Sequence, residues 1–517
     1  MEKEELQIQN ALNNKRIAKN TMMLYFRMIL TLLVSLYTSR LILNILGVED
    51  YGINNVVGGV VTMFAFFNSA MSSATQRFLS FEIGKGDTPQ IRKTFNAALI
   101  IHIGIAILVF ILAETIGLWF VKRYLVIPTG RMDAALWIYH FSVLSFLVTI
   151  MQVPYNALII SHERMNVYAY VSILEVCLKL LIVFILTAIP FDKLKLYGLL
   201  HFCVVFLIAN IFRIYTGRHF EESRFLMMRD KQLYRTVFSF SAWNLLGNIA
   251  VILKGQGVNI ILNLFYGPVV NAARGIAYQV QGALYGFVQN FQVAMKPQII
   301  KSYATDNFEY MHQLIFRGTK FSFYLLFGLS LPIMLEPEII LKLWLETVPD
   351  YSAIFVQLLL VDIIIESISG PLVTSVHASG KIKLYQVIVG TLFLLNLPLS
   401  YLFLKKGYQP EITMYVSIII TILALISRVL MASRLVNFSK TDYFRKVLIP
   451  MLLVAIVSMI PPLWIQQHHE AGGTRSLLVM LSSVLTFILA VCFIGTNRVE
   501  KDFLKSNVLS KIIKRPR

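Results

Sequence analysis

Apolar runs long enough to cross a membrane follow one another along the whole chain. Each is about 20 residues long, which is what a helix needs to span the ~30 Å hydrocarbon core of a bilayer. The runs lack the period-two alternation of membrane barrel strands, and a bilayer core offers no water to an unpaired backbone, so helices are expected. The pattern predicts fourteen helices, over residues 22–46, 53–76, 95–120, 134–160, 167–189, 195–212, 237–265, 271–294, 316–334, 353–378, 384–404, 412–433, 447–465 and 476–495.

The composition supports an integral membrane protein. Of the 517 residues, 57% are hydrophobic and only 15% are charged. A soluble protein carries charge on about a quarter of its residues. The expected fold class is therefore an all-α polytopic membrane protein.

The net charge of +19 comes mainly from Lys and Arg in the connections and tails. These residues concentrate in the N-terminal tail, in the connections after even-numbered helices and in the C-terminal tail. This positive-inside distribution predicts that both termini lie in the cytoplasm, and it argues against nucleic-acid binding. The connector 213–236 and the tail 498–517 are expected to lie against anionic membrane lipids.

The first twelve predicted helices form two sets of six, separated by the connector 213–236. The two sets share residues at nearly constant spacing: Ile42-Leu43-Asn44 with Ile261-Leu262-Asn263 and Arg77 with Lys296 at offset 219, and Pro154 with Pro371 and Tyr168 with Tyr385 at offset 217. This suggests an internal duplication into bundles 1–212 and 237–433, followed by two extra helices and a basic tail in 434–517. An even number of helices per repeat makes the repeats parallel, an arrangement that transporters use for alternating access.

Several cations lie within or at the edges of the apolar runs: Arg27, Arg40, Lys179, Lys254 and Arg274. A charge at the centre of a membrane helix costs about 2.5–3.5 kcal/mol on the insertion scale, so each needs water, an acid or an anionic ligand. Lys179 has Glu175 four residues before it on the same helix face. Arg27 is close enough to the predicted helix end to reach the interface. Arg40, Lys254 and Arg274 have no acid within one helical turn, which predicts a wet cavity that holds an anion.

Uncharged polar residues are concentrated in the predicted helices 22–46, 53–76, 237–265 and 271–294, and they include Asn248 and Gln256. These four helices are therefore expected to line the cavity. Interhelical hydrogen bonds, worth about 0.6 kcal/mol each, are the alternative role for such residues. Arg suits phosphate with its rigid fork, Lys adds a point charge, and amides and hydroxyls suit sugars.

Asp362 and Glu366 lie four residues apart on one helix face. Two carboxylates this close in a low dielectric disfavour double ionisation, which makes them candidates for a proton or sodium site that couples transport to an ion gradient. Pairing with cations from neighbouring helices is the alternative. Glu175 and Lys179 are the other ion-coupling candidates. No Walker motif, metal-ligand spacing or catalytic constellation is present, so no enzyme activity, metal or cofactor is expected beyond a coupling H+ or Na+.

Two stretches carry a family resemblance: Ser39-Arg40, Leu46-Gly47 and Glu49-Asp50-Tyr51-Gly52 near the start, and Pro154-Tyr155-Asn156-Ala157 through Glu163-Arg164 to Tyr168 in the hairpin between the fourth and fifth helices. The chain resembles polysaccharide exporters and O-antigen flippases of the Wzx type. These belong to the multidrug/oligosaccharidyl-lipid/polysaccharide (MOP) superfamily, whose members have a MATE-like fold.

The resemblance implies a V-shaped pair of six-helix bundles with a cationic lumen. It implies a protein of the bacterial inner membrane that moves an undecaprenyl-pyrophosphate-linked oligosaccharide to the periplasmic leaflet. Such a protein would work beside a polysaccharide polymerase and glycosyltransferases. The relatives' essential basic residues would correspond here to Arg27, Arg40, Arg77, Lys254 and Arg274.

Three other functions remain open: a cation-coupled multidrug antiporter, a lipid II flippase, and a non-transporting scaffold in a glycan-synthesis complex. Cationic drugs need carboxylates in the cavity, and the four cavity helices carry none. A scaffold has no need of intramembrane charges without partners.

Overall fold

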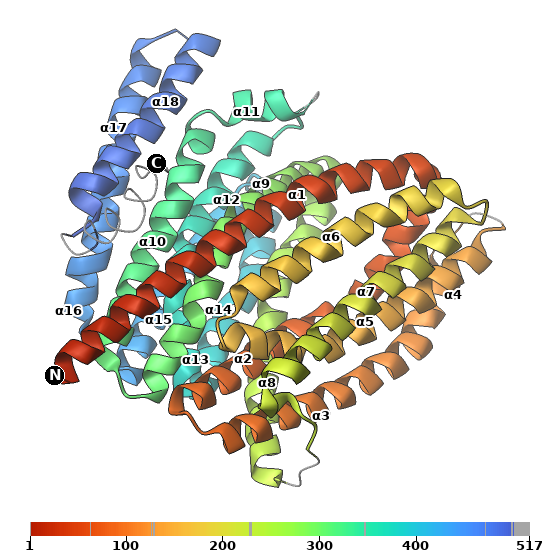
Figure 1. The fold of residues 1–517 in the computed structure, drawn as a ribbon. Coiled ribbons are helices and arrows are strands. Elements are labelled where there is room, and N and C mark those ends of the chain that lie inside the picture. Colours follow the sequence, from red (N-terminus) through yellow and green to blue (C-terminus); the bar gives the residue numbers. More distant parts are fainter. Residues whose placement is uncertain are drawn as a thin grey trace, which may run out of the picture. The chain divides into compact units, whose positions relative to one another are not determined.

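The computed structural model describes residues 2–62, 64–125, 127, 130–226, 230–345, 348–470, 472–497 and 500, and these residues form helices only (Figure 1). The α-helices are α1 (Glu2–Thr62), α2 (Ala65–Lys85), α3 (Thr88–Leu112), α4 (Leu118–Tyr124), α5 (Met132–Ser161), α6 (Met165–Ala188), α7 (Lys193–His219), α8 (Lys231–Ile252), α9 (Val258–Ala304), α10 (Phe308–Leu335), α11 (Pro337–Trp344), α12 (Ser352–Ser367), α13 (Ser369–Ser379), α14 (Lys383–Lys405), α15 (Ile412–Leu435), α16 (Lys440–Tyr443), α17 (Ile449–His468) and α18 (Gly473–Ala490). Short π-helical segments are η1 (Ala113–Gly117), η3 (Leu253–Gly257), η4 (Phe444–Leu448) and η5 (Val491–Gly495), and η2 (Glu221–Ser223) is a 3-10 turn.

Within these residues, twelve helical stretches are long and apolar enough to cross a membrane. The all-α membrane fold is confirmed, whereas the count of fourteen spans is not shown. The predicted helices 53–76 and 271–294 are not among the twelve. The stretch 271–294 carries many polar residues, which lowers its hydropathy, and 53–76 is not one continuous helix among the described residues.

Three predicted boundaries are wrong. The predicted helix 53–76 is divided between the end of α1 and α2, and α1 itself bends at Gly47, whose φ of 78° suits a residue without a Cβ. The predicted break between 265 and 271 lies inside α9, a continuous helix of 47 residues. The connector predicted over 213–236 is shorter, because α7 continues to His219 and α8 begins at Lys231.

Side-chain caps fix several helix starts. Asp87 accepts a hydrogen bond from the backbone N–H of Gln90 at the start of α3, and Asp192 accepts one from Lys195 at the start of α7. Such caps satisfy amides that have no partner inside the helix.

The chain divides into two compact units, and each is described by itself. The N-terminal unit comprises Ala18–Asn248, and the C-terminal unit comprises Met1–Ile17 with Ile249–Arg517. In the N-terminal unit, α5 packs against α2, α3 and α7, and its core includes the fully buried Phe95 and Leu158.

Side chains of the N-terminal unit hold the connector between α7 and α8. Asn96 of α3 donates to the carbonyl of Arg224 (3.2 Å) and accepts from the N–H of Leu226 (2.8 Å). His162 lies 2.6 Å from Glu222 and stacks on Phe220. Because Asn96 bonds the backbone of both Arg224 and Leu226, this part of the connector is held against α3.

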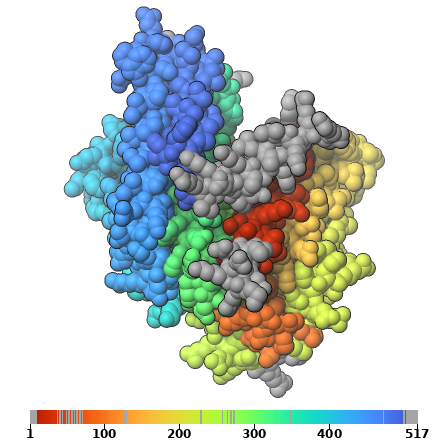
Figure 2. Space-filling view, turned by 60° about the vertical axis from the view of Figure 1, so that its left-hand side comes forward, coloured from red at the N-terminus to blue at the C-terminus, as the bar shows by residue number. Residues whose placement is uncertain are grey.

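In the C-terminal unit, the hairpin of α17 and α18 packs on α10 (Figure 1). Figure 2 shows the blue surface of this hairpin beside the green surface of earlier helices of the same unit. Polar contacts fasten both ends of the hairpin: Lys320 donates to Glu500 (2.8 Å), and Ser476 donates to Glu336 (2.8 Å). The two last predicted helices are thus part of the C-terminal unit.

Candidate functional site

A cavity of about 280 Å³ lies inside the C-terminal unit. Its charged lining residues come from three elements, namely Lys254 of η3, Arg274 of α9, and Asp362 and Glu366 of α12. The remaining lining residues are Val251, Gly255, Val258, Tyr278, Gln281, Tyr285, Leu359, Ile363, Phe393, Asn396, Thr413, Met414 and Ser417.

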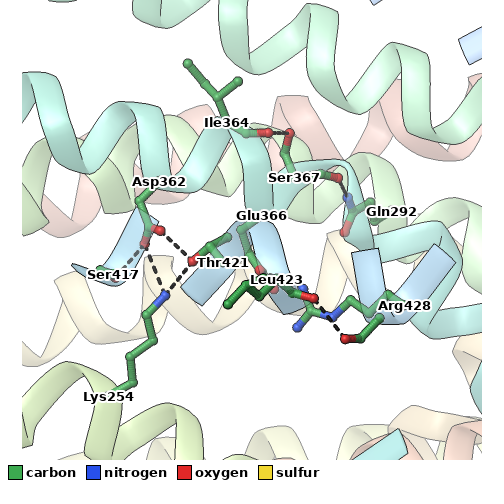
Figure 3. Close-up of polar contacts among 11 residues, drawn as sticks. Lys254, Gln292, Asp362, Ile364, Glu366, Ser367, Ser417, Thr421, Leu423 and Arg428 are labelled. Atoms are coloured by element: carbon green, nitrogen blue, oxygen red, sulfur yellow. Dashed lines mark hydrogen bonds and ion pairs between the residues drawn. The ribbon is translucent and has the colours of Figure 1, made fainter. Parts of the chain in front are cut away.

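Lys254 is positioned by the π-helical segment η3. Its ammonium donates to the hydroxyl of Thr421 (2.7 Å) and to Asp362 Oδ2 (3.3 Å) (Figure 3). A π-bulge adds a residue to one turn and often occurs at functional sites. The acidic partner of Lys254 is 108 residues away in the sequence, so local spacing does not reveal the pair.

Asp362 is the centre of this polar network. It is 8% exposed and accepts from Thr421 Oγ1 (2.5 Å) and Ser417 Oγ (3.3 Å) of α15, in addition to Lys254. Its carboxylate thus has one cationic and two hydroxyl partners, the kind of satisfaction that a buried charge requires.

Glu366 pairs with Arg428 of α15 at 2.7 Å. The ring of Phe393 on α14 lies between this pair and the first, with its centroid 5.0 Å from the Lys254 ammonium and 5.5 Å from the Arg428 guanidinium. Both carboxylates therefore have cationic partners on neighbouring helices, which was the alternative to a free two-carboxylate site.

Arg428 is not among the site residues predicted from the sequence. A signal was present, since Arg428 follows Thr421 by seven residues and so lies on the same face of α15. A lone arginine in an apolar run of this kind points toward the bundle interior.

Arg274 differs from the other cations of the cavity. It is 3% exposed, donates to the carbonyl of Gly255 (3.0 Å) and to the hydroxyl of Tyr278 (2.9 Å), and packs over the Tyr278 ring. No carboxylate pairs with it among the described residues, and its Nε has no hydrogen-bond partner there. The cavity lining has two cations and two carboxylates. Because Glu366 pairs with Arg428, which is not a lining residue, and Asp362 pairs with Lys254, Arg274 is left without a carboxylate among the described residues.

The basic candidates of the N-terminal unit contact aromatic rings. The Arg27 guanidinium lies 4.9 Å from the Tyr168 ring centroid. Arg77 is 7% exposed and lies 4.5 Å from the ring centroid of Phe78 and 5.6 Å from that of Phe240. Cation–π contacts of this kind stabilise a desolvated guanidinium without neutralising its charge.

Three other predicted site residues are not among the described residues that line this cavity. The side chains of Arg40 and Gln256 lie outside the described residues. Asn248 is half-buried near the end of α8 and does not line the cavity of the C-terminal unit.

A second cavity, of about 520 Å³, lies inside the N-terminal unit. It contains the ion pair predicted from spacing, with Lys179 Nζ 2.6 Å from Glu175 Oε1 on α6. Its lining residues are Asn54, Gly58, Val61, Ile138, Ser142, Ser145, Phe146, Thr149, Glu175, Lys179, Tyr197, Gly198, His201 and Val205.

The two cavities use matching positions of two matching helices. Four of the five α5 residues that line the N-terminal cavity are followed, 217 positions later, by α12 residues of the C-terminal cavity: Ser142 by Leu359, Ser145 by Asp362, Phe146 by Ile363 and Thr149 by Glu366. The offset is the one at which Pro154 matches Pro371. These positions follow the spacing on which the predicted internal duplication rests, and the duplication stays a prediction.

A charge cluster outside both cavities joins helix ends of the N-terminal unit. Arg131 donates to Asp50 (Nε–Oδ1 2.9 Å) and to Asp192 (Nη1–Oδ2 2.6 Å). Burial raises the pKa of Asp192, but hydrogen bonds from Arg131 and from the backbone N–H of Lys195 outweigh it, so the pKa lies below its ordinary value.

The described residues contain no group of three or more His, Cys, Asp or Glu side chains placed to hold a metal ion.

Comparison with known proteins gives two family matches. The sequence profile described as "Polysaccharide biosynthesis protein" matches residues 17–305, and the profile described as "MatE" matches residues 245–402. A comparison with curated proteins gave no match.

Solved structures of MATE transporters share the fold. One is an outward-facing multidrug resistance MATE transporter of the MOP superfamily, with TM-score 0.72 and 12% identity over 82% of this chain and 96% of that one. Another is the MATE transporter ClbM in complex with Rb+, with TM-score 0.67 and 16% identity over 83% and 96% of the two chains. At these identities the likeness concerns the fold.

Proposed function

Because the chain belongs to the polysaccharide biosynthesis protein family of the MOP superfamily, we propose that it moves an undecaprenyl-pyrophosphate-linked oligosaccharide from the cytoplasmic to the periplasmic leaflet. The chain is a multi-pass membrane transporter with a MATE-like fold, and not an enzyme. The proposal extends this to one substrate class, one direction and the bacterial inner membrane, with both termini in the cytoplasm.

The observation that carries the proposal is Arg274, a buried arginine without a carboxylate partner among the described residues. The other charged residues that line its cavity, Lys254, Asp362 and Glu366, all have ion-pair partners. Its two hydrogen bonds go to uncharged oxygens, so its charge remains available to a phosphate. A buried guanidinium is costly without an anion, and a lipid pyrophosphate supplies one. Arg27, Arg40 and Arg77 of the N-terminal unit remain further candidates for basic contacts with the substrate, and Asn248 and Gln256 for contacts with its sugar hydroxyls.

The Lys254–Asp362 pair supplies a means of coupling. When Asp362 takes up a proton or a sodium ion, its hold on Lys254 weakens, and the ammonium becomes available to the substrate anion. Glu366 with Arg428 could act in the same way. One similar MATE structure was solved with Rb+, which supports a cation as the coupled species. Glu175 and Lys179 are the corresponding candidates in the N-terminal unit.

Two alternative functions come from the same superfamily. Drug antiport fits the cavity less well, and lipid II flipping would use the same residues. A cationic drug needs a carboxylate free of internal cations, whereas Asp362 and Glu366 are both paired. Lipid II also carries a lipid pyrophosphate, so it would use the same arginine. The first proposal differs from lipid II flipping in its substrate, which glycosyltransferases supply and a polysaccharide polymerase consumes.

The test is to replace Arg274 with Ala and, separately, with Lys in the source cell, using the exposed Arg434 of α15 as the control (Arg434→Ala). We expect Arg274→Ala to lower surface polysaccharide by about 100-fold or more, because losing one charge-assisted phosphate contact costs about 3 kcal/mol. Arg274→Lys should recover part of the export. The measurements are surface polysaccharide, accumulated lipid-linked intermediate and the amount of protein in the membrane.

Normal polysaccharide in the Arg274→Ala strain, with normal amounts of the protein, would refute this assignment. Loss of cell-wall precursor export with unchanged surface polysaccharide would favour lipid II instead.

A further inference from the structure

The cavity of the N-terminal unit is the larger of the two and has a different chemistry. Its volume is about 520 Å³, within the range of small-ligand sites. Its acid and its lysine neutralise each other along one helix, with Glu175 and Lys179 in contact at 2.6 Å. Unlike the cavity that contains Arg274, it therefore offers no uncompensated charge to an anion or a cation.

Three polar side chains that line this cavity form no hydrogen bond with any described residue: Asn54, Ser142 and His201. They supply an amide, a hydroxyl and an imidazole, so the cavity presents both donors and acceptors. Polar groups inside a membrane protein are unfavourable without partners, and the cavity must hold water or a ligand rich in hydroxyls.

The same walls carry features that suit a sugar ring. Tyr197 lies beside His201 with ring centroids 5.9 Å apart, which gives an aromatic surface next to polar groups. A pyranose has a weakly polar C–H face for an aromatic ring and hydroxyls that both donate and accept. Glu175 and Lys179 add a charged acceptor and a charged donor for those hydroxyls.

The comparison of equivalent positions points the same way. Ser145 and Thr149 on α5 occupy the positions that Asp362 and Glu366 occupy on α12. Each hydroxyl donates to a carbonyl of its own helix and so keeps lone pairs free to accept. One copy of a duplicated site has carboxylates with cations, and the other has uncharged hydroxyls.

We propose that the cavity of the N-terminal unit, lined by α1, α5, α6 and α7, binds a neutral pyranose ring of the transported glycan. This inference rests on the proposed function, since it assigns a sugar part of that substrate to a second site. The recognised group is an uncharged sugar, either attached to the lipid or free.

The first experiment measures binding to the full-length protein in lipid nanodiscs without sugar-based detergent. A panel of neutral methyl glycosides and disaccharides is tested by saturation-transfer NMR. We expect at least one pyranoside to bind, and Ser142→Phe, which places a bulky ring in the cavity, to abolish the signal. The α6 variant Leu181→Phe, whose position is 49% exposed, and the C-terminal variant Arg274→Ala should both retain it.

A second variant guards against misfolding by the larger side chain. Asn54→Leu keeps the size of the residue but removes its amide, and should weaken sugar binding roughly tenfold by the loss of its hydrogen bonds. Absence of binding by every member of the panel would mean that the cavity holds only water. Binding that survives Ser142→Phe would place the sugar outside this cavity, and either result would overturn the inference.

The second experiment measures export of the lipid-linked form in cells. Ser142→Phe should lower surface polysaccharide at least about tenfold while Leu181→Phe leaves it unchanged. If Ser142→Phe exports normally while Arg274→Ala does not, the sugar site is wrong and the proposed function stands. If neither variant affects export, the proposed function fails as well.

Discussion

The two units have their charge networks in different places. In the C-terminal unit, the ion pairs Lys254–Asp362 and Glu366–Arg428 cross between helices inside the cavity. Among the described residues of the N-terminal unit, the cavity holds an ion pair along one helix, and the cluster around Arg131 crosses between elements at the helix ends.

This difference separates two roles of charge. Where ion pairs cross between helices inside a cavity, a ligand that competes for one partner also loosens the contact between those helices. Where the pair lies along a single helix, a ligand can occupy the cavity without changing helix contacts. We therefore expect ligand binding to be coupled to conformation in the C-terminal unit and to be nearly independent of it in the N-terminal unit.

The largest effect should come from breaking the buried pair of the C-terminal cavity. Lys254→Ala leaves Asp362 buried without a cation, which should cost on the order of 3–5 kcal/mol of stability. The double variant Lys254→Ala/Asp362→Ala should recover most of that loss, because it removes both charges. Thermal unfolding of the purified proteins measures both. Equal losses in the single and the double variant would show that the two residues do not act as a pair.

A smaller effect should appear at the helix ends of the N-terminal unit when pH falls. The pKa of Asp192 is lower in the folded protein than in the unfolded chain, so its stabilisation is present above the unfolded pKa and is lost as pH falls through the folded pKa. After discounting for solvent exposure, we expect a local loss of roughly 1 kcal/mol below about pH 4.

Hydrogen exchange in the segment 131–195, corrected for intrinsic rates, measures this loss. Asp192→Asn should remove this part of the pH dependence. Hydrogen exchange at the start of α18, where Ser476 donates to Glu336, is the comparison in the other unit. An unchanged pH response in the Asp192→Asn protein would contradict the assignment.

The smallest effect should come from the ion pair of the N-terminal cavity. Glu175 and Lys179 are about one-third exposed and lie four residues apart on one helix. Glu175→Gln should therefore cost only about 0.3–0.5 kcal/mol. The same unfolding assay measures it, and a loss as large as that of Lys254→Ala would end the contrast between the two cavities.

The sequence predicted the parts of this structure that depend on local spacing. Long apolar runs gave the membrane helices, because the bilayer leaves helices as the available backbone form. The Lys179–Glu175 contact followed from a separation of four residues.

Contacts between distant segments were beyond local reasoning. The pairing of Lys254 with Asp362 depends on how α12 and α15 pack against η3, and no spacing rule contains that information. The continuity of α9 past residue 270 and the bend of α1 at Gly47 likewise depend on packing and backbone geometry, which a hydropathy pattern does not record.

The π-helical segment Leu253–Gly257 has a consequence for insertions and deletions. It accommodates one residue more than an α-helical turn, and an α-helix rotates about 100° per residue. Removal of one residue other than Lys254 from this segment would restore regular α-helix and leave the flanking helical turns close to their present rotation, because the bulge absorbs the extra residue. Lys254 lies within the bulge and lines the cavity together with Arg274, so its side chain would change direction although it had not been substituted. Changes in chain length at this position should therefore be less well tolerated than most replacements of the side chains around it.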